Sequence, residues 1–203
     1  WFKRGSSLSD GDPNKPSIYH GVRTEGIACC PMAVRPGNYG SFSSSHGKIF
    51  HMEGTGGSTF EAWKIDTPLP QFCSSYGFND WLFNNRFDTS VPLHISGLNI
   101  FSLRGTDRIP VFLDCTFYNG DPSDRDRPPG TRGPPSGMSQ FCIDRHNGNI
   151  NGLFLDWSVR KIGLKELWTL EWSMQFDTAN DWTRAGGVQP EDWPEWMRTF
   201  KDY

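Results

Sequence analysis

The chain has 203 residues, of which 20 are basic and 23 are acidic, so its net charge at neutral pH is −3. This near balance of charges, without a long basic run, argues against binding to nucleic acid or an anionic membrane. No stretch of the sequence reaches the roughly 18–20 consecutive apolar residues of a membrane span. Hydrophobic residues make up 35% and aromatic residues 14%, beside 22 Gly and 15 Pro, which predicts a loop-rich α+β domain with a core of large rings.

The N-terminal half alternates polar, turn-rich stretches with short apolar segments. Residues 1–26 are predicted to form an arm or linker, and 27–203 a single globular domain. The alternation of side chains along 59–65 favours a strand with one buried face. Residues 79–84 are predicted to form a short helix that Asn79 caps.

The middle of the chain supplies further strands and one long loop. Residues 99–103 and 109–117 are predicted to be buried strands, the second because it is rich in β-branched and aromatic residues. Pro, Gly, Asp and Arg dominate 119–137, which is therefore expected to be a surface loop. Residues 142–144 and 152–162 are predicted to return to the sheet, the latter as a hairpin.

Two C-terminal segments are predicted to be helices. The apolar residues of 163–174 fit both a helix and a strand, and the helix is favoured because Lys165, Glu166 and Leu167 are strong helix formers. Residues 190–200 are predicted to form a second helix, with proline near its start and basic residues near its end. The expected α+β architecture is thus an antiparallel sheet followed by C-terminal helices.

Residues 145–160 carry the most specific pattern in the chain. His146 is followed, after nine intervening residues, by Asp156, then by Trp157 and a Ser-Val pair. The pattern resembles the C-terminal hairpin of pilin-like proteins of the type II secretion G-type pseudopilin class, of the planctomycete type. That class has glycine where this chain has Trp157. A glycine there would serve a turn residue with positive φ, which a bulky aromatic tolerates poorly, so the turn is expected to differ in this chain.

The resemblance extends along most of the chain. The tail segments 161–172 and 186–198 match well, and Cys30, 75–79 and 111–114 also look like family positions. The resemblance implies an exported structural subunit, not an enzyme, whose head assembles with itself or with other pilin-like subunits into a surface filament or secretion pseudopilus. It implies a location at the cell surface, outside the cell or in the periplasm. Such proteins begin with an apolar helix that is not seen in this sequence. Either the chain is a processed or truncated head, which is the favoured expectation, or this member has left the filament role.

The five cysteines are Cys29, Cys30, Cys73, Cys115 and Cys142, and their spacing matches no metal-binding CxxC pair. In an exported protein they are candidate disulfides, Cys115 with Cys142 and Cys73 with either Cys29 or Cys30. The odd count leaves at least one thiol free. In a cytosolic protein all five would instead be buried thiols, and a thiol titration under denaturing, non-reducing conditions distinguishes the two alternatives.

His146 and Asp156 are the residues of the motif that invite a catalytic or metal-binding interpretation. No nucleophile elbow, HExxH motif or second histidine at ligand spacing accompanies them, so no catalytic site and no cofactor are predicted. We expect His146 to hydrogen-bond within its loop and Asp156 to accept backbone N–H groups in the turn. The oxygen-rich loops 121–126 and 177–181 are candidate calcium sites, but neither follows an EF-hand register, and solvated turn carboxylates are favoured.

Six of the nine tryptophans lie in the C-terminal part of the chain: Trp157, Trp168, Trp172, Trp182, Trp193 and Trp196. They are expected to form an aromatic core beneath the terminal helices. The alternative is that their ring faces are exposed and stack on sugar rings, which would make the protein an extracellular carbohydrate-binding module. The exposure of the rings therefore bears directly on function.

Overall fold

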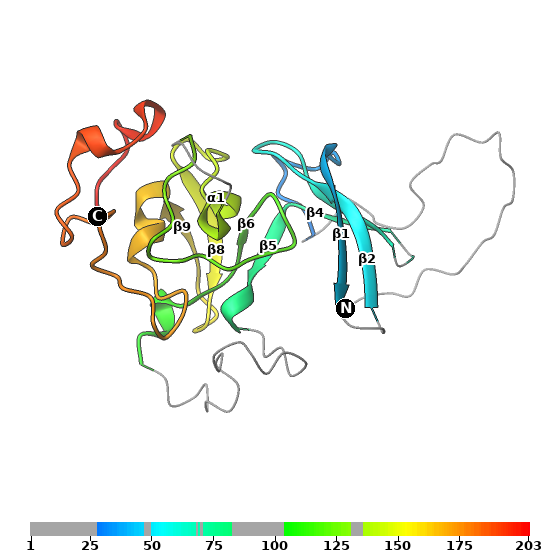
Figure 1. Cartoon of the computed structure of the whole chain (residues 1–203), viewed down its shortest axis with the longest axis horizontal. Helices are drawn as coiled ribbons and strands as arrows, with labels where there is room; N and C mark the ends of the chain where they lie inside the picture. The colour runs from blue at the N-terminus through cyan, green and yellow to red at the C-terminus, as the bar shows by residue number, and fades with distance from the viewer. Residues whose placement is uncertain (1–27, 47–49, 68, 70, 83–103, 131–135) are drawn as a thin grey trace, which may run out of the picture.

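The structure is a computed structural model that describes residues 28–46, 50–67, 69, 71–82, 104–130 and 136–203. Its first sheet has four strands in the order β1-β2-β3-β4, each antiparallel to the next. These strands span Tyr39–His46 (β1), Phe50–Gly56 (β2), Trp63–Thr67 (β3) and Phe72–Ser74 (β4). Figure 1 shows this sheet beside the second one, on the side away from the C-terminus.

The second sheet has five strands in the order β7-β5-β6-β8-β9, all antiparallel except for a short parallel pairing of β5 with β7. Ser75 alone separates β4 from β5, so the chain passes directly from one sheet to the other. Burial alternates along β8, with Ile150 and Phe154 facing the core. The strands span Tyr76–Asn79 (β5), Pro110–Asp114 (β6), Asn119–Gly120 (β7), Asn149–Phe154 (β8) and Val159–Gly163 (β9).

Helical structure in the described residues is limited to one short α-helix and several 3-10 turns. The architecture is therefore mostly β, and the predicted α+β fold with C-terminal helices is wrong. The helical elements span Gly137–Phe141 (α1), Asp80–Leu82 (η1), Thr106–Arg108 (η3), Leu164–Thr169 (η4), Pro190–Asp192 (η5) and Glu195–Met197 (η6).

Tertiary hydrogen bonds end the first predicted C-terminal helix. In an α-helix the carbonyl of Leu167 would accept the N–H of Glu171. Here the indole Nε1 of Trp172 donates to Leu167 O at 2.7 Å, and the Glu171 N–H donates instead to Arg108 O at 3.0 Å. The segment is therefore helical only over η4, and Leu170 is already extended.

A proline ends the second predicted helix. Pro194 lies inside 190–200, where it has no N–H to donate and disfavours helical φ and ψ at the residue before it. Trp193 is accordingly extended, at φ −74° and ψ 144°, and separates η5 from η6. The expectation from Pro190 and the basic C-terminal residues overlooked this internal proline.

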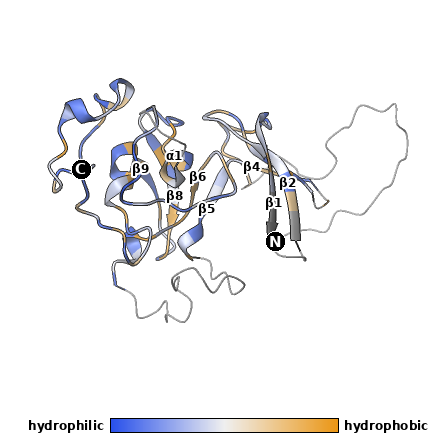
Figure 2. Cartoon of the chain, viewed as in Figure 1, coloured by the Kyte–Doolittle hydropathy of each residue, from blue (hydrophilic) through white to orange (hydrophobic). Residues whose placement is uncertain are grey.

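The main core packs against the five-stranded sheet and is rich in aromatic rings. Trp168 and Trp193 are buried and meet edge to face, with ring centroids 5.4 Å apart, while Phe141 packs on Trp172 at 4.9 Å. Figure 2 shows apolar residues on β8 and around α1, and more polar residues along the connecting segments. The prediction of a tryptophan-rich core is confirmed, although turns rather than helices cover it.

Several local predictions are confirmed. β6 lies within 109–117, and β8 and β9 form the hairpin predicted for 152–162. Asn79 caps η1 as expected, because its Oδ1 accepts the N–H of Trp81 at 3.1 Å. No helix among the described residues is long and apolar enough to cross a membrane.

Other local predictions need correction or lie beyond the description. The strand expected at 59–65 begins only at Trp63, and 142–144 is not a strand, because the Cys142 N–H completes α1 by bonding Met138 O. Residues 119–137, apart from 131–135, contain the short strand β7 beside irregular structure. The predicted arm 1–26, the strand 99–103 and residues 83–84 fall outside the described residues.

Candidate functional site

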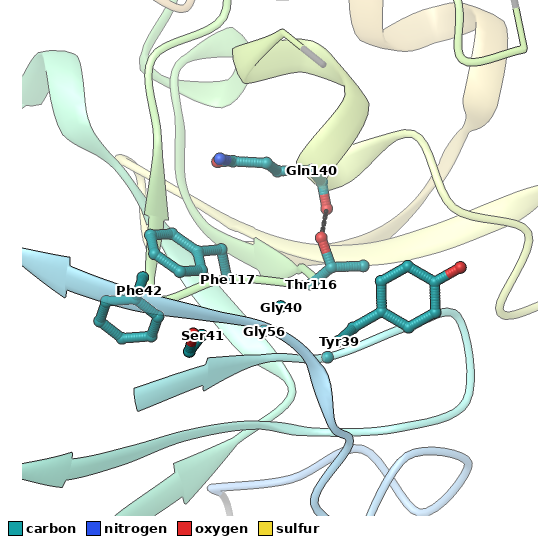
Figure 3. Close-up of a pocket in the computed structure, with 9 residues that line it drawn as sticks. Tyr39, Gly40, Ser41, Phe42, Gly56, Thr116, Phe117 and Gln140 are labelled. Carbon is teal, nitrogen blue, oxygen red and sulfur yellow. Dashed lines mark hydrogen bonds between the residues drawn. The ribbon is translucent and has the colours of Figure 1, made fainter. Parts of the chain in front are cut away.

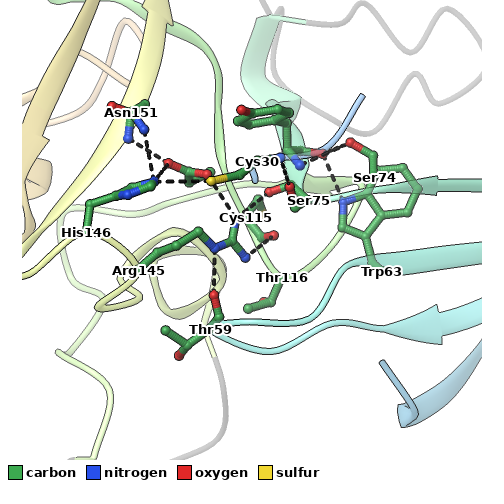
Figure 4. Close-up of polar contacts among 12 residues, drawn as sticks. Cys30, Thr59, Trp63, Ser74, Ser75, Cys115, Thr116, Arg145, His146 and Asn151 are labelled. Carbon is green, nitrogen blue, oxygen red and sulfur yellow. Dashed lines mark hydrogen bonds and ion pairs between the residues drawn. The ribbon is translucent and has the colours of Figure 1, made fainter. Parts of the chain in front are cut away.

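Cys30, Asp114 and His146 meet next to Ser75, at the passage between the two sheets. The Nε2 atom of His146 lies 3.4 Å from Cys30 Sγ and 3.1 Å from Asp114 Oδ2. Cys30 and Asp114 are buried, whereas the His146 side chain is 19% exposed. Figure 4 shows His146 and Asn151 approaching from one side and Cys30 and Ser75 from the other. The cluster is thus a buried polar site with one solvent-accessible wall.

The carboxylate of Asp114 is held at both oxygens. It ends β6, where Oδ1 accepts from Arg145 Nη1 at 2.9 Å and Oδ2 accepts from the backbone N–H of Asn151 at 2.7 Å. Asn151 lies on β8, the antiparallel neighbour of β6. Strand pairing and the ion pair therefore fix where this carboxylate points.

Arg145 is a buried cation that links the two sheets. Its guanidinium is fully buried and donates to Thr59 O at 2.6 Å, Ser75 O at 2.7 Å and Ser58 O at 3.1 Å, in addition to Asp114. Ser58 and Thr59 lie between β2 and β3, so one side chain ties the first sheet to a strand of the second. A buried charge with this many partners is primarily structural.

Three groups converge on one nitrogen of His146. Besides Cys30 and Asp114, the side-chain amide nitrogen of Asn151 lies 2.9 Å from Nε2. In a catalytic triad the nucleophile and the carboxylate bond opposite nitrogens of the imidazole. Because the thiol and the carboxylate share Nε2 here, the arrangement does not form a Cys-His-Asp relay.

Burial makes most of the thiols weak acids. Desolvation raises the pKa of Cys30, and it raises the pKa of Cys115 to about 12. Burial likewise raises the pKa of Cys142. These three thiols are therefore protonated at neutral pH in the protein alone.

The five cysteines are free thiols in the structure, so none of the candidate disulfides is present in it. Cys115 Sγ accepts the Phe117 N–H at 3.4 Å, whereas Cys142 Sγ faces Met197 Sδ at 4.0 Å. Cys30 faces His146 rather than Cys73.

Cys29 is the cysteine that lies next to Cys73. Its Sγ lies 3.7 Å from Cys73 O, and a hydrogen bond from the Cys73 thiol lowers the pKa of Cys29 to about 7. The same contact raises the pKa of Cys73. Of the two partners considered for Cys73 from the sequence, the structure thus places Cys29 beside it.

The turn between the hairpin strands keeps the conformation of a glycine turn, although the substitution by Trp157 predicted a different one. Asp156 Oδ1 accepts the Ser158 N–H at 2.9 Å, and hydrogen bonds from Ser158 lower the pKa of Asp156. Trp157 has φ 68°, the left-handed conformation for which glycine was expected, and it is 80% exposed. A bulky aromatic thus occupies a strained turn position on the surface.

His146 and Asp156 do not share a site. They flank the six-residue strand β8, one before it and one after it, which separates them by about 20 Å at the usual rise per residue. The backbone N–H of His146 bonds Asn149 O within the loop, as expected, but its ring reaches Asp114 and Cys30 on distant segments. The motif therefore divides into a partly buried histidine and an exposed turn.

The candidate stacking tryptophans are mostly buried. Trp168 and Trp172 are 0% exposed and Trp193 is 1% exposed, so their faces are not available to a sugar ring. Trp182 is half-buried and packs against the same core, 5.5 Å from the ring of Trp193. Trp157 and Trp196, which is 38% exposed, are the members of the set with accessible rings.

The oxygen-rich loops bind backbone groups. Asp126 Oδ2 accepts the N–H groups of Ser123 and Met138, and Asp177 Oδ1 accepts that of Ala179. Among the described residues, the cluster of Cys30, Asp114 and His146 is the one group of three potential metal ligands within reach of one another. The loop carboxylates thus act as turn acceptors in this structure.

A surface hollow lies between β1, α1 and the segment after β6 (Figure 3). The hollow is lined by Tyr39, Phe42, Thr116, Phe117 and Gln140. The backbone carbonyl of Gln140 accepts a hydrogen bond from Thr116 Oγ1 at 3.4 Å. No lining residue carries a charge at neutral pH. The hollow therefore offers no group suited to acid–base or metal chemistry.

Comparison with known proteins returned no matching family model, no matching curated protein and no matching solved structure.

Sequence reasoning did not identify Asp114, Arg145 or Asn151 as site residues. Arg145 and Asn151 lie within the recognised motif, and Asp114 lies inside the predicted strand 109–117, which in the structure ends at this residue. The signal available was a charged residue within a predicted buried strand, because a buried charge requires a partner. That partner is 31 residues away, and the sequence alone gives no means of pairing them.

Proposed function

We propose that this chain is the globular head of an exported structural subunit and that it assembles with other subunits through the tip of the β8–β9 hairpin. The observation that carries the proposal is Trp157, a tryptophan that is 80% exposed in a left-handed backbone conformation. Such a conformation costs about 1–2 kcal/mol for an L-residue, and strain of this kind concentrates at functional positions. An exposed tryptophan is also a common anchor of protein interfaces.

The sequence resemblance of the hairpin and the tail to pilin-like proteins supports the same role. In that design the head presents surface loops and turns to neighbouring subunits, and no reaction takes place. The hairpin is well suited to such contacts, because five paired positions connect β8 to β9 and hold the turn rigidly. A rigid tip loses little entropy when it docks.

Site-specific photo-crosslinking in the native host tests this proposal. A benzophenone amino acid at position 157 is expected to crosslink to a second copy of the chain or to another pilin-like subunit, identified by mass spectrometry. The matched control is position 174, because Met174 is also largely exposed, at 72%, but lies outside the hairpin. Equal crosslinking at both positions, or none at 157, contradicts the proposal.

The carbohydrate-binding alternative is tested separately. Burial of Trp168, Trp172 and Trp193 removes half of the six candidate stacking rings that this alternative requires. A panel of polysaccharides is expected to leave tryptophan fluorescence unchanged. Saturable quenching that Trp157→Ala or Trp196→Ala abolishes would favour glycan binding instead.

A further inference from the structure

We propose that Cys30, Asp114 and His146 form a binding site for a single zinc-like divalent cation. Their ligand atoms, one sulfur, one oxygen and one nitrogen, all lie within 4.8 Å of one another. Thiolate, imidazole and carboxylate are the three ligand types that Zn²⁺ accepts in proteins, whereas Ca²⁺ takes oxygen ligands alone. The proposal is independent of whether the hairpin tip mediates assembly.

Asp114 and Asn151 compete for the one nitrogen His146 Nε2. The carboxylate of Asp114 requires Nε2 to carry a proton, while the amide N–H of Asn151 requires the same atom to be a bare acceptor. One imidazole nitrogen satisfies only one of these demands. Turning the Asn151 amide by 180° removes the competition, and its oxygen, the Nε2 lone pair and Asp114 Oδ2 then all face the position that a cation would take.

The two separations from His146 Nε2 are close to those of a tetrahedral site. With ordinary zinc–ligand bond lengths, a tetrahedral centre separates nitrogen from sulfur by about 3.6 Å and nitrogen from oxygen by about 3.4 Å. The observed separations are 3.4 Å from Nε2 to Cys30 Sγ and 3.1 Å from Nε2 to Asp114 Oδ2. An outward movement of a few tenths of an ångström by each group would therefore accommodate the ion.

Hydrogen bonds to neighbouring groups also hold the three ligands in place. Arg145 fixes the far oxygen of Asp114, the Asn151 N–H fixes the near one, and the Cys30 backbone N–H donates to Ser75 Oγ at 2.6 Å. Such outer contacts orient metal ligands before the ion arrives. The amide of Asn151, turned by 180°, presents its oxygen as a fourth ligand, and the partly exposed side of His146 provides an entry path.

Binding would convert the Cys30 thiol to a thiolate and release its proton to solvent. The ion would connect the segment before β1 to β6 and to the loop before β8. A structural ion that joins three segments stabilises the folded chain against unfolding.

Cobalt substitution tests the proposal, because Co²⁺ occupies zinc sites and reports sulfur ligation through near-ultraviolet charge-transfer absorption. The reduced chain is expected to bind one Co²⁺ with this absorption, and excess Zn²⁺ to displace it and raise the thermal midpoint. Cys30→Ser is expected to lose the absorption and to weaken binding at least about tenfold. Cys29→Ser is the matched control, since it makes the same change one residue away, where the thiol faces Cys73 instead of His146.

His146→Gln provides a second variant in case Cys30→Ser does not fold, as judged by circular dichroism, because its side chain is partly exposed. It is expected to weaken Co²⁺ binding as Cys30→Ser does. Three results would overturn the proposal: no Co²⁺ binding by the reduced chain, unchanged binding in both site variants, or equal loss in Cys29→Ser.

Discussion

The backbone strain at Trp157 predicts an inverted order of stability for two substitutions. At most positions alanine is more stable than glycine by about 0.5–1 kcal/mol, because glycine loses more backbone entropy on folding. At φ 68° an L-residue instead carries about 1–2 kcal/mol of strain that glycine avoids. Trp157→Gly is therefore expected to be more stable than Trp157→Ala by about 1 kcal/mol.

Loss of the ring affects both variants equally. With 80% of Trp157 exposed, about 40 Å² of its surface is buried, which is worth about 1 kcal/mol by area. The free energy of unfolding of the glycine variant should therefore be close to that of the natural chain, and that of the alanine variant should be about 1 kcal/mol lower.

Urea denaturation at constant pH measures this difference, with equal m-values showing that the unfolded states are comparable. An alanine variant as stable as the glycine variant, or more stable, would refute the assignment of strain to this turn. The assay depends on the turn alone, so it is informative whether or not the hairpin tip contacts another subunit.

Three further predictions concern the interior. Arg145→Met should destabilise the metal-free chain by about 3–5 kcal/mol in urea denaturation, because it leaves the buried Asp114 charge without its guanidinium partner, and Asp114→Asn should restore part of that loss. A change below about 1 kcal/mol would contradict the ion pair. In the reduced, metal-free chain, the rate of Cys29 alkylation should rise as pH increases through about 7, because the Cys73 thiol lowers the pKa of Cys29 from 9.0. Cys73→Ala should shift this rise to higher pH. Mass spectrometry of the modified peptides measures the profile, and an unshifted profile would exclude the thiol contact. Trp172→Phe should cost at least about 2 kcal/mol, since it leaves Leu167 O unpaired and opens a cavity in the core, whereas Trp196→Phe at the surface should change unfolding by less than about 0.5 kcal/mol.

Short-range patterns in the sequence were sufficient for the hairpin and for the chemical nature of the core. The strands β8 and β9 and the turn at Asp156 lie within one continuous segment, so alternation and turn chemistry specify them locally. The conformation of Trp157 was not foreseen, because tryptophan in place of glycine predicted a different turn, whereas the hairpin keeps the positive φ with tryptophan there. The aromatic core follows from composition, since large rings supply most of the apolar area available for burial.

The C-terminal fold and the buried cluster were decided by tertiary contacts. The helix predicted at 163–174 ends because Glu171 bonds the distant Arg108, a competition that helix propensity does not contain. Cys30 and His146 are 116 residues apart in the sequence. They meet because the carboxylate of Asp114, at the end of β6, contacts Arg145, His146 and Asn151. A buried charge must be neutralised by whatever group the fold brings to it, so sequence alone specifies the need for a partner and the tertiary structure specifies which residue meets that need.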